Sequence, residues 1–266
     1  MKFKKALIPF ALAFSVLVII LPSCRQAIDE QTSTIDTLSA VATDAQTVIN
    51  SIKEKSYTVS GGYYYGKSPV YKSDSMTFFI ECYFGPKSKL PELITQTVEI
   101  KNGKTAISNF LNQNNELFFA SFHEKSANSV SENRGFYQTS KLRFADTKTA
   151  ESDSAFAASK SRLLKKEEYS NYLLGIEDVT SYVNYLLSAY DMTGDFAFKA
   201  DSVSEKDGAC SLHTSVPAAN FISVFNVLPQ STVLPEIQKV KGNFVTVNYH
   251  YEGQETVADS IAPLKK

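Results

Sequence analysis

The side chains best suited to acid–base or metal chemistry are three histidines, and they are widely separated. His123, His213 and His250 show no H-x-x-x-H spacing, and the chain has no C-x-x-C pair, so no metal site is expected. A nucleophile needs a positioned base, yet neither G-x-S-x-G nor the S-x-x-K set occurs. The phosphate-binding pattern G-x-x-x-x-G-K-[ST] is also absent. We therefore predict no enzyme activity, no metal and no cofactor.

Tyrosine is the one functional side chain that gathers in a short stretch. Tyr63, Tyr64, Tyr65 and Tyr71 lie close together in a glycine-containing segment. Tyrosine offers contact area and a hydroxyl at a small entropic cost, so these four residues form a candidate binding surface for peptide, glycan or lipid. The alternative, which we favour, is an edge strand half buried against a helix, because aromatic strands are ordinary in β domains. The absence of Trp counts against a glycan platform.

The first 24 residues have the layout of a secretory leader. Three lysines, Lys2, Lys4 and Lys5, precede the apolar run Ala6–Leu21, which is short for a bilayer span of about 20 residues. The run ends in Leu-Pro-Ser-Cys, where Cys24 is the cysteine. This ending resembles the lipobox of bacterial lipoproteins. An uncleaved transmembrane anchor with an incidental cysteine is the alternative.

The lipobox resemblance implies a cellular location for the protein. Residues 1–23 would be removed as a signal peptide, and Cys24 would carry the acyl chains, palmitate among them, that hold the protein on a membrane. Two or three acyl chains make such anchoring stable. The resemblance further implies a location in the cell envelope. Because no Asp follows Cys24, similarity to the enteric sorting scheme implies the outer membrane.

Charge and cysteine content narrow the partners. Without the three leader lysines, 24 basic residues face 28 acidic ones, a net charge of −4. With no basic block, nucleic acid is not an expected partner. Cys82 and Cys210 sit in apolar strand patterns, where a free cysteine behaves as a small hydrophobe. In an oxidising compartment they have the alternative of pairing in a disulfide.

The segment 24–55 is predicted to be a lipid-anchored helix or tether. Within residues 27–55, apolar residues recur every seven positions from Ile28 to Ile49. This stripe indicates an amphipathic helix that packs on its own domain, the interpretation we prefer. The alternative is a stalk that self-associates or docks a partner protein of the envelope.

Residues 56–266 are predicted to form a single α+β domain. Alternating strands, with hairpin turns at Asn102-Gly103 and Asp207-Gly208, indicate a large, curved, mainly antiparallel sheet. Apolar residues spaced by three and four predict one long amphipathic helix over residues 162–190, packed on the sheet. Residues 145–161 are expected to be a loop, and residues 217–229 a short helix.

Three functions remain open in a ranked order. The first is a non-catalytic binding or structural role in the envelope. The second is a carrier of a hydrophobic ligand, lipid or lipoprotein, because a curved sheet covered by a helix resembles the half-barrel of periplasmic carriers, at the level of fold only. The phenylalanines of the stretches TFFIECYF and ELFFASF would then line a cavity. The third is an envelope hydrolase without a recognisable motif.

Overall fold

The computed structural model describes residues 44–56, 62–139, 141–172, 179–253 and 255–265. The chain divides into two compact units, residues 1–48 and 49–266. Residues 44–48 are helical, and the helix runs on to residue 56 in the second unit. The leader, Cys24 and the heptad positions before residue 44 lie outside the described residues. None of the described helices is long and apolar enough to cross a membrane.

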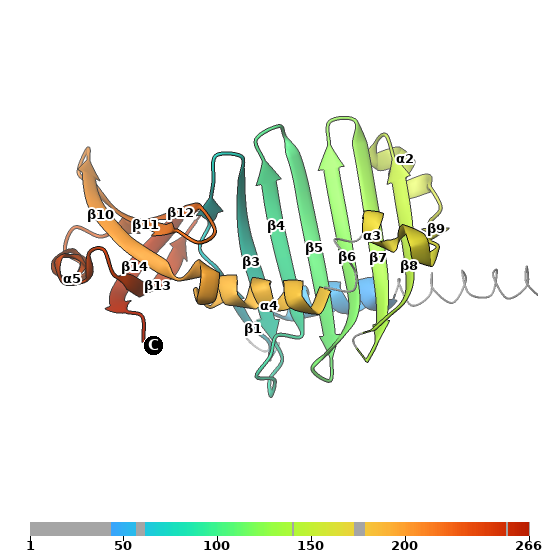
Figure 1. The fold of residues 1–266 in the computed structure, drawn as a ribbon, viewed down its shortest axis with the longest axis horizontal. Helices are drawn as coiled ribbons and strands as arrows, with labels where there is room; N and C mark the ends of the chain where they lie inside the picture. Colours follow the sequence, from blue (N-terminus) through green and yellow to red (C-terminus); the bar gives the residue numbers. More distant parts are fainter. Residues whose placement is uncertain (1–43, 57–61, 140, 173–178, 254, 266) are drawn as a thin grey trace, which may run out of the picture. The chain divides into compact units, whose positions relative to one another are not determined.

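The second unit is built on one 14-stranded sheet (Figure 1). Its largest part is a meander in which each long strand pairs antiparallel with the next. The expected Asn102-Gly103 turn is confirmed, because Gly103 has φ +80° between the second and third of these strands. The six long strands are β3 (Met76–Phe84), β4 (Leu93–Ile100), β5 (Lys104–Gln113), β6 (Glu116–Ser126), β7 (Ser129–Gln138) and β8 (Lys141–Ala150).

Short strands flank the meander. β9 (Arg162–Leu163) pairs with β8 at one edge. β1 (Tyr64–Lys67) and β2 (Tyr71–Lys72) both pair with β3 at the other. β2 also pairs with β12, which carries the sheet into its second part.

The second part of the sheet closes into a small barrel. Its strands are β10 (Phe198–Lys206), β11 (Ala209–Val216), β12 (Phe221–Val227), β13 (Phe244–Glu252) and β14 (Glu255–Pro263), with the helix α5 (Val233–Val240) between β12 and β13. β11 pairs with both β10 and β12, β14 pairs parallel with β12 and antiparallel with β13, and β13 returns to β10. This connectivity is that of an OB-fold barrel.

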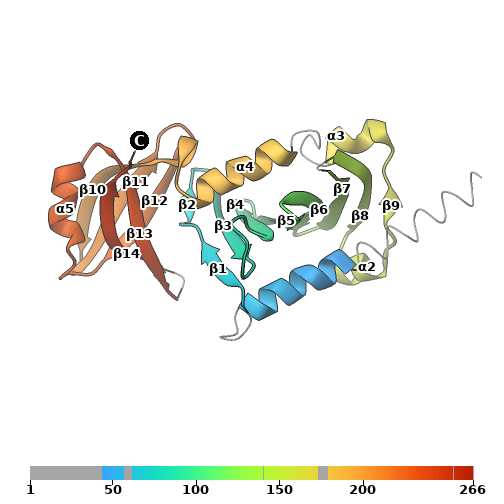
Figure 2. The ribbon, with the colours of Figure 1, turned by 90° about the horizontal axis from the view of Figure 1, so that it is seen from below.

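One apolar core runs through the sheet and the barrel. Helix α4 (Val179–Tyr190) crosses the strands of the meander, as Figures 1 and 2 show. The ring centre of Tyr182 in this helix lies 5.8 Å from that of Phe110. The Tyr182 hydroxyl donates to Gln96 Oε1 at 2.5 Å. At the junction with the barrel, the Tyr71 ring stacks on Phe78 at 4.9 Å. Aromatic packing therefore fills the face of the sheet that α4 covers.

The α+β class and the mainly antiparallel sheet are confirmed, but the single long helix over residues 162–190 is wrong. Residues 162–163 join the sheet as β9, and Leu164 inserts into the core at 3% exposed. A 3-10 turn, η1 (Lys166–Glu168), and the short helix α3 (Tyr169–Tyr172) follow. Burial of Leu164 and strand pairing outweigh the helical period there. Residues 173–178 are outside the described part of the chain.

Two further local predictions are wrong. The expected loop at 145–161 continues strand β8 and then forms the helix α2 (Asp153–Ala158), capped by Ser152, whose Oγ accepts from the Ala155 N–H at 3.2 Å. The expected helix at 217–229 is strand β12, because Ser223, Phe225 and Val227 alternate into the barrel interior. In both segments long-range pairing overrides the local signal.

Candidate functional site

The four tyrosines singled out from the sequence occupy different environments. Tyr71 is fully buried, and its hydroxyl donates to the Ala189 carbonyl at 2.5 Å, so it belongs to the core and not to an exposed surface. The Tyr63 hydroxyl donates to Glu92 at 3.1 Å. Tyr64 is 71% exposed. Tyr65 lines a pocket, and its hydroxyl donates to Glu81 at 2.8 Å.

That pocket has a volume of about 460 Å³ and lies where β1, the end of α4 and β13 meet. We call it the tyrosine pocket. Four of its eight lining residues are tyrosines, and two carry opposite charges. The lining residues are Tyr65, Gly66, Lys67, Tyr190, Asp191, Met192, Tyr249 and Tyr251.

Two tyrosine hydroxyls satisfy the backbone of the β1 segment. Alternation along β13 sends Tyr249 and Tyr251 to the same side. The Tyr249 hydroxyl donates to the Lys67 carbonyl at 2.6 Å, and the Tyr251 hydroxyl donates to the Ser68 carbonyl. Among the described strands β1 pairs only with β3, so these carbonyls lie at an edge that needs cover. The hydroxyls of Tyr249 and Tyr251 are thus already engaged by the protein.

Tyr190 stands against the backbone of Gly66. A Cβ on Gly66 would lie 2.1 Å from the Tyr190 hydroxyl oxygen, so only glycine permits this approach without a shift of the ring. The Tyr190 hydroxyl donates no hydrogen bond to the described residues, and it is the pocket tyrosine left for a ligand. Burial raises the pKa of Tyr190 to about 12, with further contributions from Cys82 and Asp191, so it is a neutral donor at physiological pH.

The tyrosine pocket contains one cationic and one anionic side chain, Lys67 and Asp191. The Lys67 ammonium lies 3.9 Å from the centre of the Phe79 ring and 4.9 Å from that of Tyr251, a cation–π arrangement. Asp191 follows the last residue of α4 at the pocket rim, and desolvation by the surrounding protein raises its pKa. Within the described part of the chain neither side chain forms an ion pair. The pocket therefore presents both a cation and an anion to a ligand.

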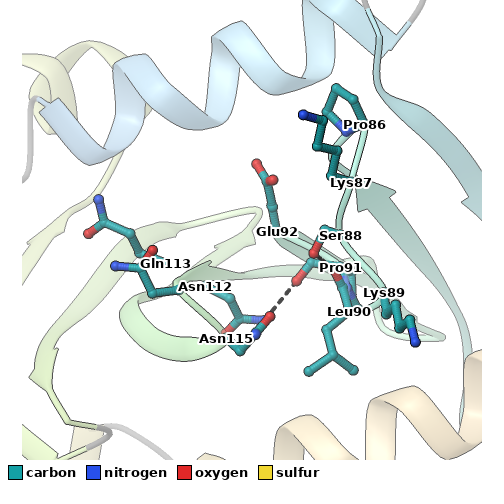
Figure 3. Close-up of a pocket in the computed structure, with 11 residues that line it drawn as sticks. Pro86, Lys87, Ser88, Lys89, Leu90, Pro91, Glu92, Asn112, Gln113 and Asn115 are labelled. Carbon is teal, nitrogen blue, oxygen red and sulfur yellow. Dashed lines mark hydrogen bonds between the residues drawn. The ribbon is translucent and has the colours of Figure 1, made fainter.

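A second hollow lies at one end of the meander (Figure 3). It has a volume of about 1020 Å³ and is formed by residues 86–92 and the turn at 112–115. The amide of Asn112 donates to the Pro91 carbonyl at 2.9 Å, which ties the two segments together. Asn114 and Asn115 have φ of +55° and +65°, the conformation that a two-residue hairpin turn requires. Turn geometry accounts for these residues, so we rank this groove below the tyrosine pocket.

A row of polar residues crosses six strands on the sheet face opposite α4. Directly paired positions carry Glu81, Thr95, Asn109, Ser121, Arg134 and Asp146. The row is largely buried and satisfies itself: Asn109 accepts from Thr95 at 2.9 Å and donates to Ser121 at 3.2 Å.

Two charged groups extend this polar row. Arg134 forms a two-pronged ion pair with Asp146 at 2.8 and 2.5 Å. The Lys53 ammonium donates to Asn109 at 3.4 Å, and desolvation lowers its pKa despite the nearby Glu81. Because the described residues of this row hydrogen-bond to one another or to neighbouring side chains, the row stabilises the sheet face and is not proposed as a ligand site.

His213 and His250 form polar contacts, but among the described residues neither belongs to a complete catalytic arrangement. His213 Nε2 lies 2.6 Å from Ser204 Oγ on the outside of the barrel, with no hydrogen bond from a described residue to its other ring nitrogen. His250 contacts Glu252 at 3.3 Å and Asp259 at 2.8 Å, and the two hydrogen bonds raise its pKa. No cluster of three or more metal-ligating side chains is found where the chain is described.

The barrel face that OB-folds use for oligonucleotides lacks the groups such ligands need. On β11 the outward positions are Ser211, His213 and Ser215. On β12 they are Ile222, Val224 and Asn226. Base stacking requires aromatic platforms and phosphate contact requires Lys or Arg; His213 is the one ring at these six positions, and no Lys or Arg stands there. The barrel connectivity therefore carries no functional conclusion by itself.

Sequence reasoning found Tyr65 but missed the rest of the tyrosine pocket. The shared face of Tyr249 and Tyr251 is visible as alternation in the sequence. Their contact with β1, some 180 residues earlier in the chain, is not. Comparison of the chain with protein-family models, curated proteins and solved structures finds no match.

Proposed function

We propose that this chain is a lipid-anchored protein of the cell envelope, in the outer membrane, whose second unit is a non-catalytic binding module. The Leu-Pro-Ser-Cys ending of the leader supports the anchor at Cys24. The tyrosine pocket supports the binding role and is the single observation that carries it. It combines aromatic walls, a neutral hydroxyl donor and two opposite charges that form no ion pair with the described residues, which is the mixed lining of small-molecule sites.

The carrier function receives less support from the structure. A carrier needs an apolar cavity of several hundred Å³. Phenylalanines of the stretches expected to line such a cavity pack against other rings instead. Between ring centres, Phe119 lies 5.2 Å from Phe136, and Phe122 lies 5.6 Å from Phe110. On the opposite face, the centre of the sheet carries hydrogen-bonded polar groups.

One contact favours a hydrolase as the second candidate function. Ser204 Oγ and His213 Nε2 are within hydrogen-bonding distance, as a nucleophile and its base must be. Labelling of the full chain with a fluorophosphonate probe tests this function. Labelling of the wild-type chain that disappears in Ser204→Ala would support the hydrolase function. Absence of labelling in the wild-type chain would contradict it.

The binding role is tested by native mass spectrometry of the lipidated chain, purified in detergent and incubated with a small-molecule extract of envelope. We expect a water-soluble adduct of a few hundred daltons that is lost on denaturation. The double variant Lys67→Gln/Asp191→Asn should lose it, whereas the matched control Lys72→Gln/Asp195→Asn, at two exposed positions outside the pocket, should keep it. An adduct extractable only into organic solvent, or one retained by the pocket variant, would contradict the proposal.

The anchor is tested separately. Labelled palmitate should enter the wild-type chain and not a Cys24→Ala variant, and the variant should fail to be processed at residue 24. Processing and membrane association that are unchanged in Cys24→Ala would contradict lipidation.

A further inference from the structure

We propose that the ligand of the tyrosine pocket is a small zwitterion of the amino acid or short-peptide class. This inference rests on the binding function proposed above and names its substrate class. It assigns Lys67 to the carboxylate of the ligand, Asp191 to its ammonium group, and the tyrosine rings to its body.

Lys67 is assigned to the anionic end of the ligand. Its backbone is fixed by β1, and its carbonyl is held by the Tyr249 hydroxyl at 2.6 Å. Its ammonium lies over the rings of Phe79 and Tyr251, without an ion pair to the described residues. A cation held on aromatic faces keeps N–H donors directed away from the rings, and a carboxylate is the partner that such donors prefer.

Asp191 is assigned to the cationic end of the ligand. This residue directly follows α4, which approaches the pocket independently of β1. It forms no ion pair with Lys67, so the pocket keeps its two charges apart. A ligand ammonium placed at Asp191 would recover the interaction that partial desolvation of the carboxylate leaves unmet.

The aromatic walls and the volume limit the ligand body. The hydroxyls of Tyr65, Tyr249 and Tyr251 donate to protein acceptors, so their rings present mainly faces and edges. Tyr190 adds one hydroxyl donor, suited to a peptide or carboxyl oxygen. A volume of about 460 Å³ accommodates a free amino acid or a short peptide and is at the small end of the range for ligand sites.

Ligands with one charge or none fit these groups less well. A simple cation in the aromatic site would be repelled by the Lys67 ammonium, and a simple anion by Asp191. A neutral sugar would leave both charges without a counter-charge. Capture of a terminal amine or carboxylate is a known mode of peptide recognition, and this pocket offers a group for each.

The test uses a defined probe, the dipeptide Leu-Leu, with its N-acetylated and C-amidated forms. Each is titrated against the detergent-purified full chain by saturation-transfer NMR. We expect the free dipeptide to bind and each capped form to bind at least about tenfold more weakly, because each cap removes one charge. Free leucine and phosphoethanolamine serve as further probes, the second to separate a lipid headgroup from an amino acid.

Variants of Lys67 and Asp191 identify which of the two side chains binds which end of the dipeptide. In Asp191→Asn, acetylation of the dipeptide should have no further effect, and in Lys67→Gln, amidation should have none, which is the logic of a double-mutant cycle. The control variants Asp195→Asn and Lys72→Gln should behave as wild type. Unchanged thermal unfolding midpoints exclude a folding defect.

The outcomes separate this inference from the function on which it rests. Equal affinity for free and capped dipeptides, preference for phosphoethanolamine, or no probe binding overturns the zwitterion assignment. If the pocket-dependent adduct is still seen by mass spectrometry, the binding function stands with a different ligand. If that adduct is also absent, the binding function fails as well.

Discussion

Removal of the buried Asp146 carboxylate should be costly, and far more so than loss of an exposed ion pair. The Asp146 side chain is 6% exposed and that of its partner Arg134 is 16% exposed. Two hydrogen bonds join the groups at 2.8 and 2.5 Å, and Arg134 also donates to Ser161 at 2.8 Å. Asp146→Asn would remove the main counter-charge of a largely buried guanidinium and leave only the longer contact with Glu132 at 4.0 Å.

The expected loss of unfolding free energy follows from this geometry. Breaking a buried pair by removing one partner costs about 3–5 kcal/mol, and residual exposure of Arg134 favours the lower end, about 3 kcal/mol. For a unit of this size, that corresponds to a fall of about 6–12 °C in the melting temperature. The exposed pair Lys104–Glu124, with side chains 34% and 44% exposed, is the matched control. Glu124→Gln should cost less than about 1 kcal/mol.

The assay is urea unfolding followed by tyrosine fluorescence, which is not masked because the chain has 14 Tyr and no Trp. The double variant Arg134→Met/Asp146→Leu should recover part of the loss, since apolar replacement removes the unpaired charge. A loss below about 1 kcal/mol in Asp146→Asn, or a double variant less stable than both single ones, would refute this reasoning.

Three further outcomes are expected. Tyr71→Phe should lower the unfolding free energy by about 1 kcal/mol in urea titrations, because the Ala189 carbonyl of α4 loses its shorter hydrogen bond and keeps only that from the Met192 N–H at 3.4 Å. His250 should titrate by NMR above its ordinary pKa, since Glu252 and Asp259 hydrogen-bond to its ring, and Asp259→Asn should bring the pKa down. Its small stabilising effect should be fully present below the unfolded-state pKa and lost as the pH rises through the higher folded-state value. Burial raises the pKa of the Cys82 thiol, so maleimide should label it only after denaturation, and labelling of the folded chain at the denatured rate would contradict its burial.

The sequence was sufficient for elements whose local pattern and burial agree. Strand β3 alternates apolar residues, and the glycine turns at residues 103 and 208 adopt the positive φ that hairpins require. Prediction from the sequence failed where the conformation of a segment depends on the strand with which it pairs. The second half of strand β8, from Ala145 to Ala150, has the small and polar residues of a loop, yet it pairs with β7, where Asp146 faces Arg134. The helix expected at residues 217–229 is instead the barrel strand β12 (Phe221–Val227), for the same reason.

Closure of the barrel and assembly of the tyrosine pocket depend on contacts that local reasoning does not reach. The parallel pairing of β12 with β14 joins segments separated by α5 and β13. The pocket brings together β1, the end of α4 and β13, and only Tyr65 among its residues belonged to the tyrosine cluster recognised in the sequence. Cys82 and Cys210 are both free, as the preferred interpretation of their apolar patterns predicted.

The most direct measurement is a crystal structure of the full chain with the retained or added small molecule. Ligand density is expected in the tyrosine pocket, with its charged ends at Lys67 and Asp191 and its body against Tyr190. Ligand density confined to the sheet face beneath α4, with the tyrosine pocket empty, would contradict the proposed binding site.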